Sequence, residues 1–374
     1  MRVGRFHLTY CSNIHAGESW PEVRTALAAV LPRVQSQLNE TGPFAIGLRL
    51  SAAAGEDLAK PLALEAFKQF LADSGHYVFT INGFPYGAFH GQRVKEQVYL
   101  PDWRDPRRVT YSNQLAEILA ALLPDDLPHG SVSTVPGAFK AHLNGAADVE
   151  DVARGIREHA RFLRDLRDRT GRTIRLALEP EPACLLETVD ETRDFFGRYL
   201  GDLHVREHVG VCVDTCHMAV EYEDPAEVIN RLVAADITIA KVQISSALDV
   251  AGAEAIDALS AFAEDTYLHQ VVTRATAELS HFTDLPDALA DAGARSLDEW
   301  RVHFHVPLFL ERLGALRTTQ PFVQAFLRAL CANPVCDQLE VETYTWDVLP
   351  EAHRRVDVAT AIARELAWVR DQLR

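Results

Sequence analysis

The chain has 374 residues, of which 48% are hydrophobic and 24% charged, as is usual for a globular protein. No apolar run approaches the roughly 20 residues that cross a bilayer, and the N-terminal segment lacks the apolar stretch of a signal peptide, so we expect a soluble cytoplasmic protein with no membrane insertion. The formal net charge of −16 argues against nucleic-acid binding, because it repels the phosphate backbone.

Short β-rich segments alternate with amphipathic helical segments along the whole chain. Most of the β-rich segments are nearly continuous apolar runs, which is typical of parallel strands covered on both faces. Alternation of this kind predicts right-handed βαβ units. Eight strands are expected, at 6–11, 45–51, 77–82, 131–135, 174–179, 209–214, 237–245 and 339–344.

Sequence signals also mark where helices begin and end. SWPE at 19–22 is a capping box and predicts a helix that runs to about Leu38. A helix from about Val149 to Arg169 is expected to stop at Gly171, because glycine favours the left-handed conformation of a helix C-terminus. Further helix starts are predicted at TVDE (188–191) and DPAE (224–227), and a last helix at 357–373.

Polar residues occupy one alternate face of several predicted strands. Because side chains alternate across a strand, these stripes would point into a closed barrel. Their polarity increases toward the strand ends where TIM barrels carry their active sites. We therefore predict an α/β fold, a (β/α)8 TIM barrel. The alternative is an open doubly wound sheet, but the eight predicted strand–helix units and the absence of a glycine-rich phosphate-binding motif argue against it. The stripes are Arg49 and Ser51, Thr80 and Asn82, Cys212 and Asp214, Lys241 with Gln243 and Ser245, and Glu340 with Glu342 and Tyr344.

A long insert separates the seventh and eighth predicted strands. Residues 246–337 far exceed the usual connection between a strand and a helix. Segments 267–274 and 300–309 inside it read as strands, which predicts an excursion such as a hairpin over the barrel mouth. No linker-like segment interrupts the chain, so we expect residues 1–374 to form one decorated domain.

Acidic residues and a histidine at separate strand ends are candidate metal ligands. Glu179, Asp214, His217 and Glu342 offer the carboxylate and imidazole groups that bind divalent cations. The alternatives are paired interior carboxylates and a hydrogen-bonded core histidine. Two further acids are rivals: Glu181, in a loop past Pro180 and so expected to be less well held, and Glu340, one layer deeper. His303 and His305 lie on one face of an extended segment, whereas the six cysteines are expected to be small buried hydrophobes.

Candidate substrate-binding residues come from the loops that follow the first and third strands and from the inward stripes. Asn13 and His15 lie in the first loop, and Asn82, Tyr86 and His90 at the third strand end and in its aromatic loop. The loop could equally pack as core. Arg49 and Lys241, on inward strand faces, and His303, in the insert, complete the predicted set.

These residues resemble the xylose-isomerase-like TIM barrels, through LALEPEP at the fifth strand, DTCH at the sixth and EVETY at the eighth. More closely, LTYCSNIHAGESW, INGFPYGAFHG, VPGAFK and WRVHFHVPLF resemble the EboE family of metabolite traffic proteins. The resemblance implies that Glu179, Asp214 and Glu342 hold one divalent metal and that His217 contacts the substrate. Gln243 stands where the superfamily usually has a histidine ligand, so His305 is a candidate replacement.

The resemblance and the residues together predict a metal-dependent isomerase or epimerase that acts on a small polyhydroxylated sugar or cyclitol. Glu179 and Glu342 would exchange a proton with the substrate while His217 orients it. The metal, Zn, Mn, Co or Mg, would act as a Lewis acid. Two alternatives stay open: a multi-zinc phosphoester hydrolase of endonuclease-IV type that also uses His303 and His305, and a non-catalytic metabolite-binding protein. A homo-oligomer is compatible with the sequence.

Overall fold

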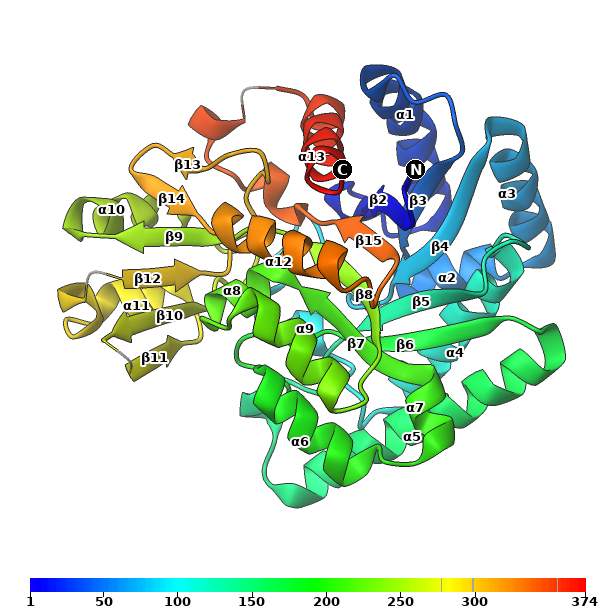
Figure 1. The fold of residues 1–374 in the computed structure, drawn as a ribbon, viewed down its shortest axis with the longest axis horizontal. Helices are drawn as coiled ribbons and strands as arrows, with labels where there is room; N and C mark the ends of the chain where they lie inside the picture. The colour runs from blue at the N-terminus through cyan, green and yellow to red at the C-terminus, as the bar shows by residue number, and fades with distance from the viewer. Residues whose placement is uncertain (277, 298, 355) are drawn as a thin grey trace.

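A computed structural model describes residues 1–374 except 277, 298 and 355, and it confirms the predicted (β/α)8 barrel (Figure 1). Neighbouring barrel strands are parallel and follow the order β2-β15-β8-β7-β6-β5-β4-β3, with a short antiparallel strand β1 (Arg2–Val3) beside β2. The eight barrel strands are β2 (Phe6–Tyr10), β3 (Phe44–Arg49), β4 (His76–Asn82), β5 (His129–Thr134), β6 (Thr173–Leu178), β7 (Val209–Asp214), β8 (Ile239–Ile244) and β15 (Gln338–Val341).

The barrel closes between β2 and β3 through a single bridge that joins Cys11 to Gly47. A side chain at position 47 would collide with the Glu340 carboxylate and with the Tyr10 backbone carbonyl. Glycine is therefore required at this seam because the first, second and eighth barrel strands approach one another too closely for a Cβ atom.

Helices surround the barrel, and their ends follow the predicted signals (Figure 1). Ser19 and Thr188 form capping boxes with Glu22 and Glu191, as predicted. At the predicted DPAE start, the Asp224 side chain caps the helix by accepting hydrogen bonds from two backbone N–H groups, without the reciprocal bond from Glu227 that a capping box would have. The helices are α1 (Trp20–Leu38), α2 (Ala52–Leu58), α3 (Pro61–Ser74), α4 (Pro106–Leu122), α5 (Ala146–Thr170), α6 (Val189–Tyr199), α7 (Leu203–His208), α8 (Thr215–Val220), α9 (Pro225–Ala234), α12 (Gln320–Ala332) and α13 (Val358–Gln372).

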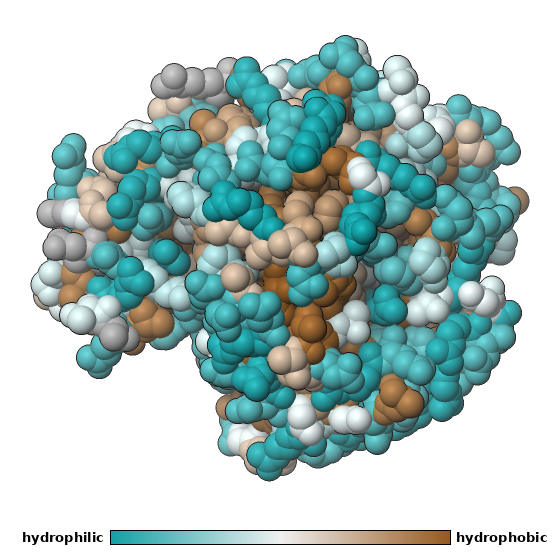
Figure 2. Space-filling view, viewed as in Figure 1, coloured by the Kyte–Doolittle hydropathy of each residue, from teal (hydrophilic) through white to brown (hydrophobic). Residues whose placement is uncertain are grey.

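The outer surface reflects the amphipathic character of these helices. Figure 2 shows hydrophilic residues over most of the periphery of one face, with hydrophobic residues gathered nearer its centre. Gly171 ends α5 with a φ of 71°, the left-handed conformation expected for that position. Among the described residues, no helix combines the length and the apolar character needed to cross a membrane.

The insert forms a second sheet, which is larger than the predicted hairpin. Six antiparallel strands follow the order β11-β10-β12-β9-β14-β13 and project from one side of the barrel (Figure 1). Its apolar residues Trp300 and Val302 belong to the same buried cluster as the barrel strands, although one domain over the whole chain stays a prediction. The elements are β9 (Leu248–Ala251), α10 (Ala253–Ala258), β10 (Val271–Ala275), β11 (Glu278–Phe282), α11 (Leu285–Ala290), β12 (Glu299–Val302), β13 (Arg312–Leu313) and β14 (Leu316–Thr318).

The strand expected at 300–309 ends at Val302, and this early end matters for the site. Beyond it the backbone N–H of His303 donates to the Gln270 carbonyl (2.8 Å) and that of Val306 to the Ser246 carbonyl (2.9 Å). These two bonds carry the HFH segment from the insert back onto the end of the barrel.

Candidate metal centre

Three carboxylates converge at the C-terminal ends of the barrel strands. Glu179 directly follows β6, Asp214 is the last residue of β7, and Glu342 directly follows β15. One oxygen from each lies within 4.8 Å of the others, and the three residues are only 2%, 0% and 4% exposed. The carboxyl ends of barrel strands all emerge on one face, so acids from distant parts of the chain meet here.

Within the described part of the chain, two of these carboxylates keep an oxygen without a hydrogen-bond partner. They are Oε2 of Glu179 and Oδ2 of Asp214, both buried. Burial, together with repulsion between the acids, raises the pKa values of Glu179 and Glu342 well above their ordinary range. A buried anion without a partner is costly. A divalent cation would remove that cost, so this donor set fits a metal ion.

One oxygen of Asp214 and one oxygen of Glu342 are held by hydrogen bonds. Oδ1 of Asp214 accepts the backbone N–H groups of Cys216 (2.7 Å) and His217 (3.0 Å) and the hydroxyl of Ser245 (2.6 Å), as the N-cap of α8. Oε1 of Glu342 accepts the side-chain amides of Asn13 (2.8 Å) and Asn82 (2.9 Å). Asp214 and Glu342 therefore each use one oxygen for positioning and leave the other for a ligand.

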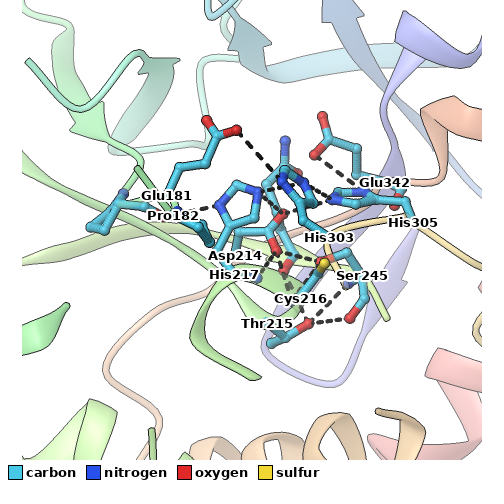
Figure 3. Close-up of polar contacts among 12 residues, drawn as sticks. Glu181, Pro182, Asp214, Thr215, Cys216, His217, Ser245, His303, His305 and Glu342 are labelled. Carbon is cyan, nitrogen blue, oxygen red and sulfur yellow. Dashed lines mark hydrogen bonds and ion pairs between the residues drawn. The ribbon is translucent and has the colours of Figure 1, made fainter. Parts of the chain in front are cut away.

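Three histidines lie beside the carboxylates, and each is held through its Nδ1 atom (Figure 3). Their Nδ1 atoms donate to carbonyl oxygens: His217 to Pro180 (2.9 Å), His303 to the side chain of Gln270 (2.7 Å) and His305 to the backbone of Glu342 (2.9 Å). Because a carbonyl only accepts, the proton of each neutral ring lies on Nδ1. Each Nε2 then carries a lone pair, as metal-binding histidines do when an outer partner fixes the ring.

These Nε2 atoms point at one another. The separations are 3.2 Å between His217 and His303 and 3.3 Å between His303 and His305. Two lone pairs at this distance repel. Burial lowers the pKa of His303 well below its usual value and that of His305 to about 4, so protonation does not relieve the repulsion between these two rings. Oδ2 of Asp214 lies 4.0 Å from Nε2 of His217 and 3.9 Å from that of His305, so Asp214 faces both groups. A cation fits this imidazole cluster as well.

The two rival acids occupy different surroundings. Glu340 lies 2.5 Å from Lys241 in the barrel interior, with both side chains fully buried, so its charge is neutralised there. Glu181 was expected to be less well held than Glu179, and this expectation is wrong. Its Oε1 accepts the Tyr99 hydroxyl (2.8 Å) and the Gln270 amide (3.3 Å), since the aromatic loop and the insert both reach it.

Several of the predicted residues line one pocket above the carboxylates. The pocket encloses about 500 Å³, its open mouth included. Gln243 lies beside Asp214 in the strand register, and its buried amide has no hydrogen-bond partner among the described residues. His305 belongs to the imidazole cluster just described. The predicted residues on the pocket surface are Asn13, Asn82, Glu179, His217, His303 and Glu342.

The other predicted substrate-binding residues face elsewhere and do not belong to the pocket lining. The Arg49 guanidinium donates to the Gly17 and Gly87 carbonyls and to Glu18, which ties the first and third loops together. Lys241 pairs with Glu340. Their charges are used inside the protein, which corrects their predicted position.

Three further side chains, from the loops after the first and third strands, also lie outside the pocket lining. His15 contacts the Tyr10 hydroxyl through Nε2 (3.1 Å). Tyr86 packs edge-on against Tyr111, and His90 packs against the Phe89 ring. Part of the aromatic loop therefore packs as core, which was the alternative that the sequence left open.

Sequence reasoning missed Gln270 and Cys216. Gln270 fixes the His303 tautomer and also contacts Glu181, and its only signal is a polar residue ahead of an apolar strand. The Cys216 thiol lies within 4.8 Å of nitrogens of His303 and His305, although burial raises its pKa well above the usual range. Neither contact could be predicted because both depend on the path of the insert.

A family model described as "Xylose isomerase-like TIM barrel" matches residues 48–295. No similar sequence is found among curated proteins. Three solved structures are similar in fold at 12–13% identity. They are a xylose isomerase-like TIM barrel protein from Mycobacterium smegmatis in complex with magnesium (12%, TM-score 0.54, 100% of this chain and 98% of that one), a D-tagatose 3-epimerase-like protein (12%, 0.53, 98% and 97%), and the probable 3-DHS dehydratase AsbF from Bacillus anthracis (13%, 0.51, 96% and 97%).

Proposed function

Because the chain belongs to the xylose isomerase-like TIM barrel family, we propose that it is a metal-dependent isomerase or epimerase of a small sugar or cyclitol. The observation that carries the proposal is the convergence of Glu179, Asp214 and Glu342, with buried oxygens left free for a cation. The motif resemblance to the EboE metabolite traffic proteins belongs to the same proposal.

Glu179, Asp214 and Glu342 would hold the divalent cation. His305 and Gln243 would supply the neutral ligands that complete its coordination. When bound, the cation supplies Lewis-acid activation of adjacent hydroxyl and carbonyl oxygens. Zinc, manganese, cobalt and magnesium all accept oxygen ligands. The carboxylates suit magnesium and manganese, and the imidazoles favour zinc.

The chain's own residues would then move one proton. One carboxylate, Glu179 or Glu342, accepts the proton from the carbon beside the substrate carbonyl, and the other returns a proton to the neighbouring carbon or to the opposite face. Asn13 and Asn82 hold Oε1 of Glu342, which keeps its second oxygen aimed at the site. The Pro180 carbonyl fixes the ring of His217. Its Nε2 would accept a hydrogen bond from a substrate hydroxyl and so orient the substrate.

Solvent exchange tests this proposal. Metal-loaded protein is incubated with a panel of ketoses, aldoses and inososes in D₂O, and deuterium at the carbon next to the carbonyl is followed by mass spectrometry. Uptake is expected for the true substrate and is expected to be lost in Glu179→Gln and Glu342→Gln. Glu65→Gln, whose side chain is 69% exposed, is the matched control. Conversion without any uptake would point to a hydride shift and contradict the mechanism.

A multi-zinc phosphoester hydrolase is the second candidate, and the imidazole cluster favours it. His217, His303 and His305, with Oδ2 of Asp214 nearby, offer donors for a second ion beside the carboxylates. Elemental analysis separates the candidates, since one metal per chain supports the isomerase and two or more support the hydrolase. Ligand binding that is unchanged when a chelator removes the metal would instead support a non-catalytic carrier. Gln243 favours this reading, because a neutral amide is a weak metal ligand.

A further inference from the structure

The pocket has two chemically different parts. Its floor carries polar side chains: the carboxylates of Glu179, Glu181 and Glu342, the amides of Asn13 and Asn82, and the imidazoles of His217 and His303. Its walls are mostly apolar and come from the aromatic loop, the insert and the segment after β15. They include Phe84, Phe89, Val98, Tyr267, Leu268 and Tyr344.

Three of the wall rings contact one another. Ring centroids are 5.0 Å apart for Phe89 and Tyr267, 5.3 Å for Phe89 and Tyr344, and 5.1 Å for Tyr267 and Tyr344. The Tyr267 hydroxyl donates to the Phe89 carbonyl (3.0 Å), so the polar end of this ring is already satisfied. The wall thus adjoins the floor at Tyr344, whose hydroxyl lies 3.5 Å from Nε2 of His303.

The pocket offers no free cation within the described residues. Lys95, the one lysine or arginine in its lining, is 4% exposed and donates to Asp284 (2.6 Å) and to the Glu264 carbonyl (3.0 Å). Below the floor, Lys241 is paired with Glu340.

A helix N-terminus could replace a cation in holding phosphate, but α8 begins at the floor with its N–H groups already bonded to the Asp214 side chain. Phosphate and carboxylate groups are usually held by free arginine or lysine. Apart from a bound metal ion, a substrate with such a group would therefore meet no free positively charged partner among the described pocket residues, beside the carboxylates of Glu179, Glu181 and Glu342.

We propose that the substrate is an uncharged amphiphile, with adjacent oxygens on a polyol head and an apolar, ring-containing substituent. The head lies on the carboxylate floor, and this placement rests on the proposed function. The substituent lies against Phe89, Tyr267 and Tyr344, where removal of apolar surface from water favours binding and ring stacking adds to it.

Three small probes test the inference on the full, metal-loaded chain by isothermal titration calorimetry. 1-Phenyl-1,2-ethanediol and 1,2-propanediol share a vicinal diol and differ in a phenyl or methyl group, and glycerol 1-phosphate adds an anion. The phenyl diol is expected to bind at least tenfold tighter than 1,2-propanediol, and glycerol 1-phosphate no tighter than 1,2-propanediol.

Variants assign the preference to the wall. Tyr267→Ala is expected to remove it, Tyr267→Phe to keep it because the ring stays, and the control Leu62→Ala, at a side chain that is 88% exposed, to leave it unchanged. Thermal unfolding checks that each variant is folded.

Equal affinity for the two diols, binding of neither, or tighter binding of glycerol 1-phosphate would overturn the inference, even if the deuterium experiment succeeds. A phenyl preference together with substrate conversion that takes up no deuterium would leave the inference in place and contradict the proposed proton transfer.

Discussion

Replacing Asp214 by asparagine separates the capping role of this residue from cation binding. Asparagine keeps the Oδ1 atom that accepts the N–H groups of Cys216 and His217, and it caps helices as well as aspartate does. It removes one of three charges whose oxygens lie within 4.8 Å. At that distance two unit charges repel by about 3.5 kcal/mol at an effective dielectric constant of about 20.

Only part of this repulsion can be recovered, since the raised pKa values of Glu179 and Glu342 mean that protons already relieve some of it. We expect the metal-free variant to be about 1–2 kcal/mol more stable than the wild type, a Tm increase of a few degrees. With cation at about 100 times its Kd, the wild type gains about 2.7 kcal/mol and overtakes the variant, which gains little.

Circular dichroism melts in EDTA and with added zinc or manganese measure both effects. Asp168→Asn, at a surface position whose side chain is 65% exposed, is the matched control and should change stability by under about 0.5 kcal/mol. A variant that is less stable than the wild type in EDTA would refute the repulsion argument. An equal metal-induced shift in both proteins would show that Asp214 is not a ligand.

Three further substitutions test other parts of the structure. Gly47→Ala is expected to destabilise the fold by about 3 kcal/mol, because the methyl group meets Glu340 at the barrel seam; an unchanged urea midpoint would contradict this close approach. Gln270→Leu should lower zinc affinity about 10–100-fold in a chelator competition, since Nδ1 of His303 loses its acceptor; unaltered affinity would argue against the imidazole cluster as a ligand set. Burial raises the pKa of Glu365 from 4.5 to about 7, so its ionisation weakens the folded state as pH rises through that window. The free energy of unfolding of Glu365→Gln, relative to that of the wild type, should therefore rise by up to about 3 kcal/mol between pH 4.5 and 8, as measured by urea titration. A difference that does not change with pH would count against this.

Much of the fold follows from local pattern. The apolar strands, the alternating helices and the capping signals at Ser19, Thr188 and Gly171 are short-range features, and the structure places the corresponding elements within a few residues of the prediction. The meeting of acids at three strand ends also follows, because parallel strands in a closed barrel all deliver their C-terminal ends to one face.

What the sequence determined by itself was therefore the barrel and the strand ends that bear Glu179, Asp214 and Glu342. Only the tertiary structure decided which charges are free. Lys241 could have faced the pocket, but strand register sets it against Glu340, and Gln270 reaches both His303 and Glu181 only because the insert folds back. The reason is physical: periodicity reports which face of an element is buried, whereas a side chain's partner depends on contacts between segments far apart in the chain.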